Sequence, residues 1–228
     1  MTTATAPERI PFVNNFLLKA LLGWYLLFWA AMAISPLDRP FWVLTNVLPV
    51  LLIVGLIATH RSYPLSDVSY LAIGVFLSLH AIGTHYTYTN VPFGFWMEDL
   101  LGFHRNHFDR IVHFSFGFLI VYPFRELLHR STRITGFWAY ALPVITVMAF
   151  ASFWEVLESW VARIAAPELG LAALGAQGDI WDAQRDMSSA VYGAVLCTLI
   201  IIAARYFLDD EDDDNAQEEP EIETAMGN

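Results

Sequence analysis

The chain has 228 residues, of which 56% are hydrophobic and 15% are charged, and its mean hydropathy is +0.47. This composition excludes a disordered chain and indicates a membrane protein. The formal net charge of −11 has a local origin, because ten of the 23 acidic residues lie between Asp209 and Glu223. The rest of the chain is nearly neutral, which excludes a broad basic surface for nucleic acid. The single Cys197 excludes an intramolecular disulfide and a thiolate metal cluster.

Six apolar windows are each long enough to cross a bilayer as a helix, which takes about 20 residues. In chain order we expect them near residues 16–35, 40–59, 65–83, 109–128, 137–160 and 187–207. Prolines or polar stretches separate neighbouring windows, as Pro36 and Pro40 do between the first two. The sequence therefore predicts an all-α, polytopic membrane helical bundle with about six transmembrane helices in one domain, residues 10–207.

Two segments outside the windows have features of their own. The tail, residues 208–228, is densely acidic and poor in apolar residues, so we expect charge repulsion to keep it disordered. Such a tail suits a basic cytoplasmic partner. The aromatic segment from Tyr86 to Trp96 is predicted to be a loop at the level of the lipid head groups.

The orientation in the membrane follows from the Lys and Arg residues in the short loops. If the N-terminus is cytoplasmic, that side collects seven basic residues and the opposite side five. The cluster from Arg125 to Arg133 directly follows a span and is the densest. We therefore expect both termini to lie in the cytoplasm.

Ionisable side chains gather at four window ends, which alternation of direction places at one membrane face. His80 and His85 close the third window, and the fourth opens with a dense polar block between His104 and His113. Glu155 and Glu158 lie near the end of the fifth window, and three aspartates precede or open the sixth, namely Asp179, Asp182 and Asp186. Ionisable groups at membrane depth are costly and often functional, so this convergence predicts a polar site on the envelope side.

The spacings suggest the chemistry of this site. Asp109 and His113 are four residues apart and share a helix face, so the carboxylate can orient the imidazole. Glu155 and Glu158, three apart, also share a face. Asp179, Asp182 and Asp186 form a stripe if their segment is helical. We expect two groups of residues: acids or bases at Asp109, Glu155, Glu158 and Asp186, and ligands of a divalent metal at His107, His113, Asp179 and Asp182.

Each of these patterns also fits a structural role. Asp109 and His113 can form a buried hydrogen bond that fixes helix packing. Glu155 and Glu158 can pair with Arg105 and Arg110 as internal ion pairs. Asp179 and Asp182 can cap the sixth helix. No phosphate-binding glycine loop, nucleophile elbow or haem-attachment motif is present in the sequence, and no organic cofactor site is predicted.

Three blocks of the sequence resemble the YjdF-type family of bacterial inner-membrane proteins. They are His85-Tyr86-Thr87-Tyr88, the stretch from Arg105 to Arg110 with His113-Phe114, and Gln177-Gly178-Asp179 with Trp181-Asp182 and Asp186-Met187. The resemblance covers about residues 10–207 and implies a multi-span inner-membrane fold without implying a reaction. A fainter likeness to VanZ-like membrane proteins rests on Asp109, His113, Glu155 or Glu158, and Asp186.

Three functional hypotheses remain open from the sequence. The first is a metal-assisted hydrolase or transferase that acts on a lipid or lipid-linked molecule, whose head group such a site can reach from the bilayer. The second is an ion- or proton-coupled transporter that uses the carboxylates. The third is an accessory or structural subunit of a membrane complex, in which the polar cluster holds the helices together.

Overall fold

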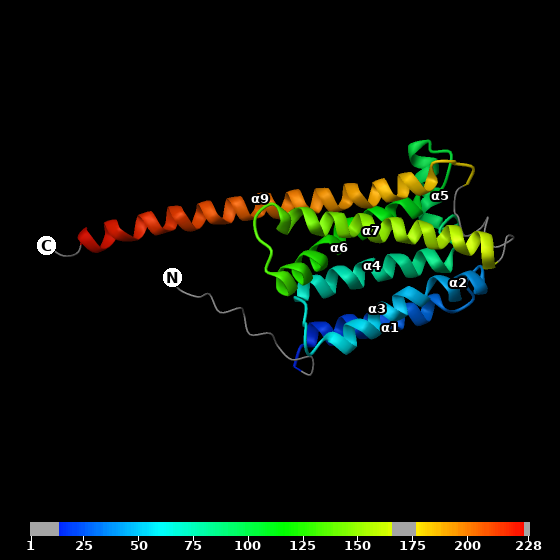
Figure 1. Cartoon of the computed structure of the whole chain (residues 1–228), viewed down its shortest axis with the longest axis horizontal. Helices are drawn as coiled ribbons and strands as arrows, with labels where there is room; N and C mark the ends of the chain where they lie inside the picture. The colour runs from blue at the N-terminus through cyan, green and yellow to red at the C-terminus, as the bar shows by residue number, and fades with distance from the viewer. Residues whose placement is uncertain (1–13, 166–176, 226–228) are drawn as a thin grey trace.

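The computed structural model of the chain describes residues 14–165 and 177–225, and it is helical without strands in those ranges (Figure 1). The helices are α1 (Phe16–Met32), α2 (Arg39–Thr45), α3 (Val47–Thr59), α4 (Asp67–His85), α5 (Pro92–Leu101), α6 (Phe108–Thr132), α7 (Trp138–Trp160) and α9 (Asp182–Ala225). A π-helical turn, η1 (Val161–Ala165), follows α7. The prediction of an all-α membrane bundle is confirmed.

Five helical segments of the described residues are long and apolar enough to cross a membrane. They are Arg39–Thr59, Asp67–His85, Phe108–Thr132, Trp138–Ile164 and Asp182–Phe207. The remaining predicted window corresponds to α1, which is apolar over 17 residues. At about 1.5 Å per residue, α1 is slightly shorter than the roughly 30 Å hydrocarbon core.

Local sequence signals set the beginnings of three helices. The side chains of Asn15, Asp38 and Ser66 each accept a hydrogen bond from the backbone N–H three residues later, at the starts of α1, α2 and α4. These caps satisfy N–H groups that have no partner within the helix. The first turns are therefore fixed by the residues that precede each apolar window.

Two segments outside the windows differ from the expectation. The aromatic segment is only partly a loop, because Pro92 begins the short helix α5, which ends at Gly102 with a left-handed φ of 69°. Proline suits the first turn of a helix and glycine its end. Helix α9 continues through the acidic segment to Ala225, where we expected disorder. The division into a membrane domain and a separate tail stays a prediction.

Helix α6 is the centre of the bundle. It packs against α4, α7 and α9, while α1 packs on α4. A Cβ atom at Gly117 would lie 2.7 Å from the carbonyl carbon of Ala190, and one at Gly193 would lie 2.8 Å from the backbone nitrogen of Phe118. The backbones of α6 and α9 are thus in direct contact, beside a buried cluster formed by Val121, Val147, Ala151, Ala190 and Ala194. This crossing holds the beginnings of α6 and α9 next to each other.

Candidate functional site

Four helix ends that carry ionisable residues lie at the same end of the bundle. The last turns of α4 and α7 and the first turns of α6 and α9 meet there, near α5 (Figure 1). Among the buried polar residues of this end are His80, Asp109, His113, Asp182 and Asp186. Alternation of helix direction, which the sequence predicts, produces this arrangement. What each side chain contacts depends on the packing.

His113 lies between two carboxylates from two helices. Its Nε2 atom is 3.4 Å from Oε1 of Glu155 on α7 and 3.7 Å from Oδ1 of Asp109, one turn earlier on α6. The residues His113 and Asp109 are 7% and 8% exposed. Oε1 of Glu155 has no hydrogen-bond partner among the described residues. An imidazole held against two carboxylates is an arrangement that can accept and return a proton.

Arginines of the α6 region pair with aspartates at the start of α9. Nη2 of Arg110 is 2.8 Å from Oδ2 of Asp179 and 2.9 Å from Oδ1 of Asp182. Nη1 of Arg105 is 2.6 Å from the same oxygen of Asp182. Arg185 approaches Asp179 to 2.7 Å from the outer side. Asp179 itself precedes α9, so the expected helical stripe begins only at Asp182.

The two glutamates of α7 have different surroundings. Glu155 faces His113, whereas Oε1 of Glu158 accepts a hydrogen bond of 2.7 Å from Nε1 of Trp154. The sequence analysis also offered a structural role in which these glutamates pair with Arg105 and Arg110. In the described part of the chain neither glutamate forms such a pair.

Asp186 lies deeper along α9 and is only 2% exposed. Its Oδ1 atom is 3.7 Å from Nε of Arg110, and within residues 14–165 and 177–225 no group donates a hydrogen bond to that oxygen. The site therefore contains carboxylate oxygens that are buried and yet lack donors. Such groups are costly unless a ligand, water or a proton satisfies them.

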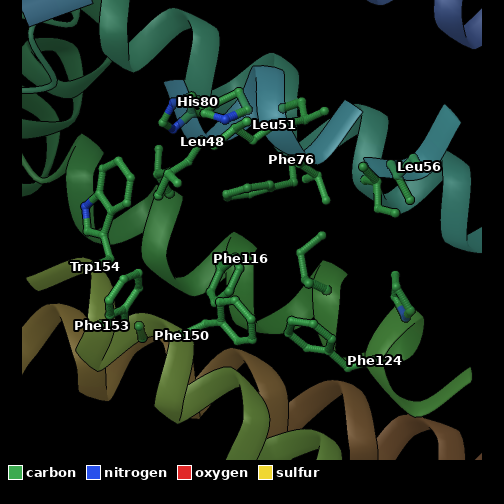
Figure 2. A pocket seen from close by; sticks show the side chains of 18 of the residues that line it. Leu48, Leu51, Leu56, Phe76, His80, Phe116, Phe124, Phe150, Phe153 and Trp154 are labelled. Atoms are coloured by element: carbon green, nitrogen blue, oxygen red, sulfur yellow. The ribbon is translucent and has the colours of Figure 1, made fainter. Parts of the chain in front are cut away.

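A cavity of about 570 Å³ extends from this polar end along the bundle (Figure 2). Figure 2 shows Leu48, Leu51 and Leu56 of α3 on one side and Phe150, Phe153 and Trp154 of α7 on the other. Phe116 and Phe124 of α6 also line it. Most of its wall is hydrocarbon, while its polar lining includes His80, Tyr88, Asp109 and His113.

His80 and Tyr88 form a hydrogen-bonded pair in the wall of the cavity. Nε2 of His80 lies 3.1 Å from the carbonyl oxygen of Thr45, which can only accept, so this nitrogen donates. The other ring nitrogen, Nδ1, then accepts from the hydroxyl of Tyr88 at 2.7 Å. Burial, together with the charges of Asp109 and Glu158, raises the pKa of Tyr88 well above its ordinary value. Tyr88 therefore remains a donor at neutral pH.

Two residues that the sequence analysis did not assign to the site connect its two halves. The side-chain amide of Gln177 donates 2.9 Å to the carbonyl of Asn106 and accepts 3.1 Å from the N–H of Asn106. The buried Asn106 side chain also bonds Val91 and the N–H of Phe108. Gln177 and Gly178 both have positive φ, so a tight turn presents this amide. In the sequence, these two residues could have been found from the blocks Arg105 to Arg110 and Gln177-Gly178-Asp179, which carry the family resemblance.

The four expected metal ligands lie in three different surroundings. His113 contacts Asp109 and Glu155, Asp179 and Asp182 contact the arginines, and His107 lies in a separate hollow against Phe103. No three His, Cys, Asp or Glu side chains within the described ranges are grouped so that they could hold a metal ion. The metal assignment therefore rests on the sequence pattern.

Two titratable groups just outside the spans have shifted pKa values. Burial lowers the pKa of His107, as do the charges of Arg110, Arg105 and Arg185, while Asp182 opposes the shift. The hydrogen bond from Arg110 is the largest cause that lowers the pKa of Asp179. At neutral pH His107 is accordingly neutral and Asp179 is ionised.

The fold and this site define a polytopic helical membrane protein whose polar groups adjoin an apolar cavity within the bundle. Residues 17–207 match the family described as Predicted membrane protein (DUF2238). The chain is 37% identical to the inner membrane protein YjdF of Escherichia coli (strain K12) over 173 residues, which are 74% of this chain and 80% of that protein. The chain thus belongs to the DUF2238 family and is a multi-pass protein of the inner membrane. No solved structure matches it.

Proposed function

We propose that the chain is an enzyme that acts by acid/base chemistry on the polar head of an amphiphilic lipid or lipid-linked molecule. The observation that carries this proposal is the cavity, which is apolar over most of its wall and lined by Asp109 and His113 at its polar end. Its volume of about 570 Å³ lies within the range of roughly 300–1,000 Å³ that is usual for small-molecule sites.

The surroundings of the cavity suit a molecule that enters from the bilayer. Helices α3 and α7 form opposite walls and do not pack closely on each other. Leu51 of α3 and Phe153 of α7, which line the cavity, are 59% and 49% exposed. A hydrocarbon chain can pass between them without crossing water, and its head then reaches the polar end.

The residues suggest how the reaction proceeds. In this proposal His113 takes a proton from a hydroxyl group or water at the head of the substrate, and Asp109 and Glu155 orient the ring and stabilise its charged form. Glu158 and Asp186 are further buried carboxyl groups that can exchange the proton with the solvent side. The ion pairs of Arg105 and Arg110 with Asp179 and Asp182 position α6 and α9 around this centre.

A metal-assisted form of the reaction has less support than the residue-based form. It would use His107, His113, Asp179 and Asp182 as ligands, and these residues do not face a common point in the described ranges. Elemental analysis of the purified protein beside a His113→Ala variant separates the two forms. Stoichiometric zinc, iron or manganese that is lost in the variant would favour the metal.

We also propose that the polar end faces the envelope and that both termini are cytoplasmic. The excess of basic residues near Arg125 to Arg133 supports this orientation, since such residues favour the cytoplasmic side. The acidic residues after Asp209 would then be available to a basic cytoplasmic partner. Labelling of single cysteines at Asp99 and Ser131 with an impermeant reagent in intact cells tests the orientation, with labelling expected at Asp99 alone.

The function is tested by incubating the protein in lipid vesicles with the total lipid extract of the host membrane and following each lipid by mass spectrometry. We expect a lipid to be converted by the wild type and not by His113→Gln or Glu155→Gln. Leu52→Trp, which fills the cavity, should also abolish conversion, whereas Val54→Trp on the lipid-facing side of α3 should not. If His113→Gln lowers only stability while conversion continues, the polar cluster is structural and the proposal is wrong.

A further inference from the structure

Three hydrogen-bond donors at the polar end of the cavity are already engaged within the protein, and Nε2 of a further lining residue, His113, lies between Asp109 and Glu155. The indole N–H of Trp154 donates to Glu158, and the hydroxyl of Tyr88 donates to His80. The remaining ring nitrogen of His80 is directed to the carbonyl of Thr45. A ligand head that needs donors finds none of these three available.

The acceptors at the same end are open. Asp109 lines the cavity, and no donor within the described ranges forms a hydrogen bond with its carboxylate; Nε2 of His113 lies 3.7 Å away. Oε1 of Glu155 lies 3.4 Å from the same Nε2 atom, outside the residues that line the cavity, and also lacks a hydrogen-bond donor in the part of the chain that the structure describes. Buried acceptors in this state are expected to be completed by a donor from outside the protein.

Positive charge is kept away from the cavity. None of the described residues that line it is an arginine or a lysine. The nearby Arg110 is turned toward α9, where it contacts Asp179 and Asp182. An anionic head group placed beside Asp109 would therefore find no cationic side chain in the cavity wall with which to pair.

Resting on the proposed function, we infer that the cavity accepts a long-chain amphiphile whose head donates hydrogen bonds and carries no negative charge. A hydroxyl-bearing head or an amine completes the open carboxyl oxygens of Asp109, whereas a phosphate or carboxylate head brings further acceptors to a cavity whose described lining contains no arginine or lysine. This preference identifies the substrates as polyol or amine amphiphiles.

Three photoreactive probes with the same 16-carbon chain and a diazirine near its end test the inference. Their heads are glycerol ether, primary amine and phosphate monoester. The protein is reconstituted in phosphatidylcholine vesicles, irradiated with each probe and mapped by mass spectrometry. Labelling of the α6 segment 112–124 is divided by labelling of Leu199 and Ile200, which face outward on α9. This ratio corrects for unequal partition of the probes into the vesicle.

For the wild type we expect the ratio to be about tenfold higher for the glycerol ether and the amine than for the phosphate, the effect of one hydrogen bond that completes a buried acceptor. Asp109→Asn, which can donate as well as accept, should bring the three ratios close together. The control Asp99→Asn, which removes an exposed acid of α5 at the same end of the bundle, should leave them apart.

Equal ratios for the three wild-type probes, or a higher ratio for the phosphate, would overturn the head-group inference while leaving cavity binding intact. That comparison needs no variant, so it decides the matter even if Asp109→Asn fails to fold. If the ratios of all three probes are the same in Leu52→Trp as in the wild type, the cavity binds no chain and the proposed function fails as well.

Discussion

Replacing Gly117 by alanine tests whether the crossing of α6 and α9 holds the site together. The added Cβ would lie 2.7 Å from the carbonyl carbon of Ala190 and 2.9 Å from the amide nitrogen of Ala194, whereas ordinary contacts begin at 3.4 Å. These are backbone atoms that cannot rotate away, and the carbonyl oxygen of Ala190 is closer still, so the helices must separate by roughly an ångström or more. Overpacking of this kind typically costs about 1–3 kcal/mol.

Replacing Gly55 by alanine is the matched control. Gly55 lies in α3, and a Cβ there meets nothing within 4 Å. Replacing a helical glycine by alanine where there is space stabilises a helix by up to about 1 kcal/mol. We therefore expect Gly117→Ala to be less stable than the wild type and Gly55→Ala to be equal or more stable.

The measurement is the unfolding midpoint of the protein in detergent, followed by tryptophan fluorescence under heating or increasing denaturant. A second readout is lipid conversion, which should fall in Gly117→Ala because the α6 and α9 carboxylates move relative to each other. If Gly117→Ala is as stable and as active as Gly55→Ala, the close crossing does not position the site.

Two further predictions concern the polar end of the bundle. Arg110→Ala should lower the free energy of unfolding by about 1.5–3 kcal/mol, because the buried Asp182 loses one of its two arginine partners and keeps Arg105. Arg185→Ala, whose side chain is 55% exposed, should cost much less, and equal losses in the two variants would contradict the assignment. The lowered pKa of His107 means that the unfolded chain binds a proton more readily than the folded protein as the pH falls below about 6.5. The free energy of unfolding should therefore fall as the pH is lowered from 8 to 5.5, and it should fall less in His107→Gln. An identical pH dependence in the variant would contradict this role of His107.

Spacing in the sequence predicts contacts within one helix of the site but not contacts between helices. Asp109 and His113 share a face because they are four residues apart on a helix, and they are neighbours in the structure. The same reasoning offered Glu155 as a partner for the arginines, yet Glu155 faces His113. Spacing along one helix gives a common face, whereas the partner across the interface depends on the rotation of both helices.

The cavity and the Asn106–Gln177 pair lie beyond this kind of prediction. Gln177 is 71 residues from Asn106, and the turn that presents it needs positive φ at Gln177 and Gly178. The cavity exists because α3 and α7 form opposite walls without packing closely on each other, which no apolar window reveals. Both features arise from non-local packing.

The helices and the end of the bundle at which the polar residues meet can be predicted from the residues alone. Apolar windows of bilayer length must be helical, because lipid satisfies no backbone hydrogen bonds, and successive spans must alternate in direction. The packed fold is needed to know which carboxylate faces His113, which aspartates pair with Arg105 and Arg110, and where the helices leave a cavity. The physical reason is that the close contact at Gly117 and Gly193 sets the rotation and spacing of α6 and α9, and those two quantities depend on residues far apart in the chain.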